Sequence, residues 1–179
     1  MMKIKKSIVK FFAAALCIFM TFLATGCVRY NARIVDSGVS FRQAFLEENR
    51  TYGAYYHNDA YDPEQDDWSE EWLYDETSPK TRTYAIKDQA TLEEIFAAFP
   101  KTDFEKEMVL VHLYTDIYGR ARVLKDVSVD ENNALKIQFT IQSQSGCVAR
   151  GDASAPQCKS LVVKMDRLDI TTVEFEYVK

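Results

Sequence analysis

The stretch Met108-Val109-Leu110-Val111-His112-Leu113-Tyr114 decides the fold. This almost unbroken apolar run has the length of one strand, and such a run is typical of a strand buried in a sheet. A histidine in this setting most often has its hydrogen bonds satisfied in the core or on a sheet face. We therefore predict a buried strand at 108–114 and assign His112 no catalytic role.

Further strands are predicted on both sides of this run. From Ala134 to Gln142 apolar and polar side chains alternate, with the period of a half-buried strand. The preceding Asp130-Glu131-Asn132-Asn133 has the composition of a turn. A weak strand pattern starts by Asn31, and other strand-like segments cover 83–87, 120–129, 161–165 and 172–178.

One helix is predicted before the buried run. Thr91-Leu92-Glu93-Glu94 has the pattern of a capping box, and Pro100 ends the segment. Ser40 is placed to cap a second, shorter helix that carries Phe41, Ala44 and Phe45. The apolar stripe of the first helix consists of Leu92, Ile95, Phe96 and Phe99.

Together these elements predict an α+β fold. We expect a largely antiparallel sheet of about five to six strands, covered by one or two helices. Residues 31–179 have the usual length of one globular domain, and residues 52–79 form an acidic aromatic insertion within it.

The N-terminus has the pattern of a secretory signal. Basic residues precede an apolar run from Phe11 to Leu23, and small residues follow. A retained spanning helix is the alternative, but it would need about 20 apolar residues. Leu23-Ala24-Thr25-Gly26-Cys27 resembles the lipobox of bacterial lipoproteins. The resemblance implies that 1–26 are removed, that Cys27 carries a diacylglycerol, and that 27–30 tether an extracytoplasmic, membrane-anchored domain.

Two cysteines remain for a disulfide outside the cytoplasm, Cys147 and Cys158. Two cysteines without a neighbouring histidine cannot complete a zinc site. Between them lies a candidate adhesion loop, Arg150-Gly151-Asp152, which resembles the tripeptide of integrin ligands. The simpler interpretation is a turn that uses Gly151 and Asp152.

Charge limits the possible partners. The chain has 22 basic and 27 acidic residues, and loss of the four signal lysines would leave 18 basic residues and a balance of −9. Nucleic acid is an unsuitable partner, because binding to phosphates requires clustered lysine and arginine.

The insertion at 52–79 holds nine acidic residues and no lysine or arginine. The simplest interpretation is a solvated loop whose rings pack partly onto the domain. Alternatively, its aromatic side chains bind a glycan, a peptide or another ligand. The candidate ligand-binding residues are Tyr61, Trp68, Trp72 and Tyr74.

The carboxylates of the insertion suggest two further chemistries. A weak calcium candidate is disfavoured because Pro63 interrupts it and the EF-hand spacing is absent. Paired carboxylates at 59–76 could hydrolyse glycans, but no single pair stands out. The calcium candidate consists of Asp59, Asp62, Asp66 and Asp67.

The C-terminal part resembles a known family. Asp103-Phe104-Glu105 leads into the buried run, Tyr118-Gly119 forms a turn, and a long hairpin follows. The chain then returns through Cys158-Lys159-Ser160-Leu161 to Val173-Glu174-Phe175. This order is similar to the C-terminal domain family named after PrcB, a protease-complex subunit, over roughly 80–177. The resemblance implies a non-catalytic accessory or interaction domain.

These observations favour a lipid-anchored binding module over an enzyme. The module would present a sheet surface and the acidic aromatic segment to an envelope protein or a small ligand, without a cofactor. The alternative is an envelope hydrolase that acts on glycans through carboxylates of 59–76.

Overall fold

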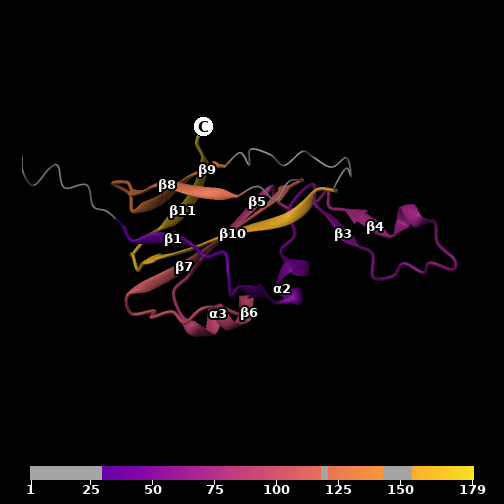
Figure 1. The fold of residues 1–179 in the computed structure, drawn as a ribbon, viewed down its shortest axis with the longest axis horizontal. Helices are drawn as coiled ribbons and strands as arrows, with labels where there is room; N and C mark the ends of the chain where they lie inside the picture. The colour runs from indigo at the N-terminus through magenta and orange to yellow at the C-terminus, as the bar shows by residue number, and fades with distance from the viewer. Residues whose placement is uncertain (1–29, 118–120, 143–154) are drawn as a thin grey trace, which may run out of the picture.

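The computed structural model describes residues 30–117, 121–142 and 155–179. Strands dominate these residues, with 46% strand against 12% helix. Figure 1 shows the main sheets at one end of the molecule and β3 and β4 at the other. The elements in chain order are β1 (Ala32–Ile34), β2 (Ser40–Phe41), α2 (Gln43–Glu48), β3 (Tyr55–His57), η1 (Trp68–Glu70), β4 (Trp72–Tyr74), β5 (Thr81–Ile86), α3 (Gln89–Ile95), β6 (Phe96–Ala98), β7 (Glu107–Asp116), β8 (Arg122–Val129), β9 (Ala134–Ile141), β10 (Gln157–Asp166) and β11 (Thr172–Tyr177).

The central sheet has four antiparallel strands in the order β1-β10-β7-β5. Its strand β7 contains the predicted buried run, and that prediction is confirmed. Met108, Val109, Leu110 and Val111 all have 0% exposure, so consecutive side chains on opposite faces are buried. Burial on both faces explains why the run is apolar throughout rather than alternating.

A second sheet, in the order β11-β9-β8, covers one face of the central sheet. Leu135, Ile137 and Phe139 of β9 form one core cluster with Leu110 and Val163 of the central sheet. The predicted turn at 130–133 joins β8 to β9, and Asn133 takes a left-handed φ of 58° within it. Asparagine tolerates this conformation better than most residues.

The opposite face of the central sheet is covered by α2, α3 and the two-stranded β2–β6 ribbon. Leu92 and Ile95 of α3 and Phe96 of β6 form a second core cluster with Val109 and Val111 of β7. Within this layer the ring centroids of Phe41 and Phe96 are 4.5 Å apart.

The predicted fold class, α+β with one sheet covered by one or two helices, is wrong. The fold is sheet-dominated, and its strands form several separate sheets. One face that we expected a helix to cover is covered by β8, β9 and β11 instead. Among the described strands the pairing is antiparallel except that β11 runs parallel to β9.

The predicted helix limits are also wrong. Asp88 caps α3 by accepting hydrogen bonds from Thr91 N at 2.8 Å and Thr91 Oγ1 at 3.0 Å, so the helix begins before the proposed capping box. The helix ends at Ile95, because Phe96 enters β6 and pairs with Phe41. Ser40 lies in β2, and α2 has no side-chain cap.

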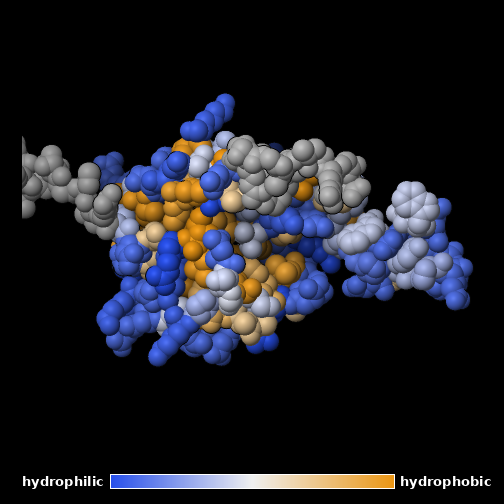
Figure 2. Space-filling model, in the orientation of Figure 1, coloured by the Kyte–Doolittle hydropathy of each residue, from blue (hydrophilic) through white to orange (hydrophobic). Residues whose placement is uncertain are grey.

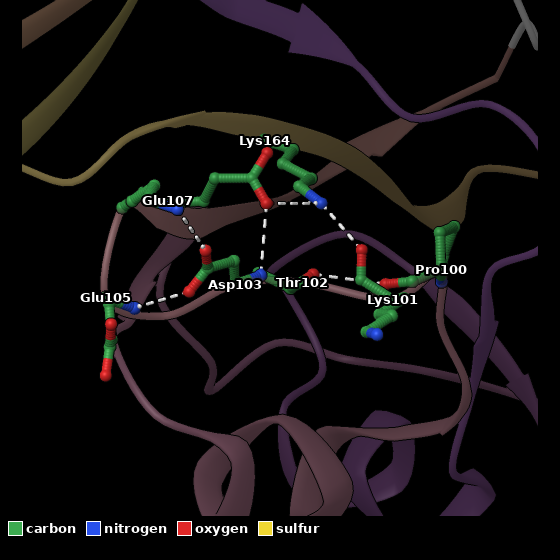
Figure 3. Close-up of polar contacts among 8 residues, drawn as sticks. Pro100, Lys101, Thr102, Asp103, Glu105, Glu107 and Lys164 are labelled. Atoms are coloured by element: carbon green, nitrogen blue, oxygen red, sulfur yellow. Dashed lines mark hydrogen bonds and ion pairs between the residues drawn. The ribbon is translucent and has the colours of Figure 1, made fainter.

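An ion pair joins Lys164 of β10 to Glu107 at the start of β7, and Lys164 also bonds the loop before β7 (Figure 3). Lys164 is 5% exposed, and its Nζ lies 2.7 Å from Glu107 Oε2 and donates to Lys101 O at 2.8 Å. Glu107 Oε2 also accepts from Asp103 N at 3.1 Å. The hydrogen bond from Lys164 holds the pKa of Glu107 below its usual value, although burial opposes this.

We expect Lys164→Met to lower the free energy of unfolding by about 2–3 kcal/mol, because it leaves a partly buried carboxylate without its cation. Urea unfolding monitored by fluorescence measures this loss. The matched control is Lys136→Met, which removes a surface pair with Glu176 at 3.1 Å and should have much less effect. Equal losses in the two variants would contradict the structural role of Lys164.

Candidate functional site

The most distinctive surface of the molecule is a projecting arm, residues 55–74. Its base is the antiparallel pair of β3 and β4, and the chain between these strands extends away from the sheets (Figure 1). The space-filling view shows the arm standing clear of the body (Figure 2).

One face of this arm carries an ordered row of aromatic rings. Tyr55 pairs with Tyr74 across the strands, and His57 pairs with Trp72. The ring centroids are 5.2 Å apart in the first pair and 5.7 Å apart in the second, both edge to face. Tyr52 extends the row, 6.3 Å from Tyr74. We call these five residues the aromatic face.

The aromatic face is open to solvent. Tyr52 is 44% exposed, Trp72 46% and Tyr74 41%. Large exposed rings that lie together are unusual on a monomeric surface and mark sites of interaction. Between β3 and β4, Trp68 is 79% exposed on η1, which Asp67 caps by accepting from Ser69 N at 2.9 Å.

The base of the arm is firmly attached to the central sheet. Thr115 of β7 donates from its hydroxyl to Tyr52 O at 2.8 Å. Asp75 accepts from Ser78 N at 2.8 Å and from Thr77 N at 3.0 Å. Burial would raise the pKa of Asp75, but these hydrogen bonds outweigh it and lower the pKa. The rings are therefore presented on a fixed support.

The reverse side of the arm carries a half-buried ring, Tyr56, and an exposed leucine, Leu73. The Arg50 guanidinium lies 3.5 Å from the centre of the Tyr56 ring, in a cation–π contact. Tyr56 pairs with Leu73 across the strands. The row of several exposed rings is therefore confined to the aromatic face.

The carboxylates of the arm mainly stabilise its turns. Asp62 Oδ1 accepts from Glu64 N at 3.0 Å, and Asp66 Oδ2 accepts from Asp62 N at 2.7 Å. Within the described part of the chain, no group of three or more histidine, cysteine or acidic side chains could hold a metal ion. The four aspartates of the calcium candidate therefore do not form a coordination site.

The structure separates the four predicted ligand-binding residues. Trp72 and Tyr74 lie together on the aromatic face, whereas Trp68 lies on η1, outside the paired strands. Tyr61 is half-buried in a turn, where partial desolvation and then the neighbouring carboxylates, Glu71 first, raise its pKa. Sequence reasoning did not select the other members of the aromatic face, Tyr52, Tyr55 and His57.

The hydrolase alternative requires two carboxylates of 59–76 in one pocket. A depression of about 440 Å³ lies beside the base of the arm, and Asp59 is its only lining residue from that segment. Asp59 is highly exposed, and its Oδ1 lies 3.6 Å from His57 Nδ1. Asp59 therefore has no second carboxylate of 59–76 beside it in this depression, whose other acidic lining residue is Glu47 of α2.

Rings and one cation also stack between the two main sheets. The His112 ring lies 4.6 Å from Phe175 and 5.7 Å from Tyr114, and the Arg122 guanidinium lies 3.7 Å from the Tyr114 ring centre. Thr83 Oγ1 is 3.0 Å from His112 Nδ1. Burial, and then the charge of Arg122, lower the pKa of His112 to about 4. The prediction of a satisfied core histidine agrees with this geometry.

Other predicted sites lie outside the described residues. These are the lipidation site Cys27, the adhesion loop Arg150-Gly151-Asp152, and Cys147. Cys158 is half-buried and has a free thiol in the structure. The Cys147–Cys158 disulfide therefore stays a prediction. None of the described helices is long and apolar enough to span a bilayer.

The chain matches no family model, no curated protein and no solved structure. The resemblance to the PrcB C-terminal domain family stays a prediction.

We predict that His112 makes the fold sensitive to acid. The unfolded imidazole takes up a proton near its ordinary pKa of 6.5, whereas the folded one resists protonation down to about 4. The free energy of unfolding should therefore fall as the pH drops from 6.5 to 4, by about 3 kcal/mol. Denaturant unfolding across this range measures the effect. His112→Phe keeps a ring but cannot titrate, so its pH profile should be flatter; superimposable profiles would contradict the prediction.

Proposed function

We propose that this protein is a lipid-anchored, extracytoplasmic binding module that holds another envelope protein through the aromatic face of its arm. One observation carries the proposal: on one face of a firmly based, projecting hairpin four rings pair in register, and a fifth, Tyr52, extends the row. Aromatic side chains are enriched among the residues that dominate binding energy at protein interfaces. Rings already held in place lose little conformational entropy on binding.

The charge of the surrounding segment suggests the kind of partner. Residues 52–79 hold nine acidic residues and no lysine or arginine. Such a segment favours a partner surface that bears lysine or arginine, because these side chains can pair with carboxylates and also lie over aromatic rings. It disfavours anionic lipid headgroups.

The proposed anchor places the arm near the membrane. Strand β1 begins at Ala32, only a few residues after Cys27. An extended residue spans at most about 3.6 Å, so a lipid on Cys27 would hold the domain within roughly 15 Å of the bilayer. Partners would then be proteins that reach this layer of the envelope.

We expect Trp72→Ala combined with Tyr74→Ala to reduce partner binding at least about tenfold, since truncation of a central aromatic residue commonly has this effect. The measurement is quantitative recovery of crosslinked partners from gently solubilised native membranes. The control combines Val123→Ala and Tyr177→Ala, which are 39% and 50% exposed on the second sheet. Undiminished recovery with the arm variant would contradict the proposal.

The anchor has a separate test. We expect Cys27→Ala to move the protein from the membrane fraction to the soluble fraction and to abolish incorporation of a clickable palmitate analogue. Cys158→Ala is the matched control and should leave both unchanged. A Cys27→Ala protein that still fractionates with carbonate-washed membranes would show that something other than the lipid retains it.

A further inference from the structure

The outer edge of β10 is paired at both ends and open between them. At one end β1 pairs with Val163–Met165, and Val35 N donates to Val162 O at 2.9 Å. At the other end, Tyr55 N at the start of the arm donates to Pro156 O at 2.7 Å. Two separate segments of the chain therefore bond the same strand edge and leave a gap between them.

In an antiparallel strand the main-chain N–H and C=O groups of alternate residues point to opposite sides, which identifies the main-chain groups that face this gap. Val162 and Pro156 direct their carbonyl oxygens outward, away from β7, so the other even-numbered residues of the strand also direct their main-chain groups outward. Cys158 and Ser160 are the two such residues in the gap. Among the described residues, neither has a main-chain partner on this side.

The gap exists because the chain turns away from β10 after Val35. Continued pairing in the β1 register would bring Ser37 opposite Ser160, but the backbone bends at Ser37 and Gly38, where Gly38 takes a left-handed φ of 71°. The chain then returns toward the domain through β2. The edge is therefore interrupted by the fold itself.

Space is available beside the open edge. Two depressions of about 350 and 340 Å³ adjoin it, and both are lined by Ser160, Phe41, Tyr114 and Arg122. The first also has an apolar wall that includes Val35 and Val39. The open main-chain groups thus border a hollow with apolar side chains around it.

We propose that this edge accepts an extended polypeptide segment as an added strand, hydrogen-bonded to the main chain of Cys158 and Ser160. Only an extended backbone offers donors and acceptors at the two-residue spacing that this edge requires. At about 3.3 Å per residue, the interval from 156 to 162 admits a segment of about three to five residues. An apolar side chain of the segment would enter the hollow beside Val35 and Val39.

The shape of the edge favours a free segment over a second copy of the chain. Strand β1 lies beside one end of β10 in the sheet, and Tyr55 at the start of the arm bonds Pro156 on the same side just before the other end, so the gap is recessed between two flanking segments. Two recessed edges could not approach to the 4.8 Å or so that strand pairing requires. A flexible segment of another protein can enter.

This inference rests on the proposed function in that the chain binds polypeptide, but it concerns a different surface from the aromatic face. The test uses the full-length chain in detergent and a displayed library of random ten-residue peptides as the probe. The most enriched peptide is then synthesised with a single N-methyl group at each position in turn. N-methylation removes one donor without changing the side chain.

We expect binding to fall at least about tenfold for N-methylation at alternate positions, and to change little at the positions between them. Ser160→Pro should abolish binding, because it removes an outward donor at a place where an edge strand tolerates proline. The matched control, Lys125→Pro, places proline at the bulge of edge strand β8 and should bind normally.

Three results would overturn the inference. They are failure to enrich any peptide, equal binding by Ser160→Pro, and N-methyl effects without alternation. The peptide scan uses the unaltered protein, so it decides the question even if the proline variant does not fold. If these tests fail while the Trp72→Ala and Tyr74→Ala variant still loses its partner, the strand-addition inference is wrong and the proposed function stands.

Discussion

Burial of β7 on both faces is the constraint on which the rest of the structure depends. A strand with Val109 on one side and Leu110 on the other, both without exposure, needs an apolar layer against each face. The sheet β11-β9-β8 supplies one layer, and α2, α3 and the β2–β6 ribbon supply the other. Partners β10 and β5 satisfy the main chain of β7, and the outer side of β10 is left to β1 at one end and open between Pro156 and Val162.

The positions of the strands were predicted from the sequence better than the way in which the strands pair with one another. The apolar run at 108–114 and the alternation at 134–142 depend on local periodicity, which sequence records directly. Alternation does not say which sheet a strand joins, so the second sheet and the parallel β11 were missed. The end of α3 was also missed, because Phe96 leaves the helical pattern to pair with Phe41, which is distant in sequence.

The candidate site also combines residues that the sequence alone indicates with residues that only strand pairing brings together. Composition was enough to select Trp72 and Tyr74, because aromatic residues in a highly acidic segment are conspicuous. Their neighbours Tyr55 and His57 become part of the site only through the register of β3 with β4. The alternate positions of these rings within each strand are a pattern that could have suggested a common face. Tyr61 was selected for the same reason, as an aromatic residue of the acidic segment, but a turn places it among carboxylates and not on the aromatic face.

The arm and the open edge of β10 are physically connected. The hydrogen bond from Tyr55 N to Pro156 O joins the first residue of β3 to the strand edge, and Tyr55 also belongs to the aromatic face. A segment added along β10 would therefore end beside the rings of the arm. One partner could use its main chain on the edge and its side chains on the aromatic face. Two such contacts on one rigid support act at high effective concentration, so each can be weak alone and still give a stable complex.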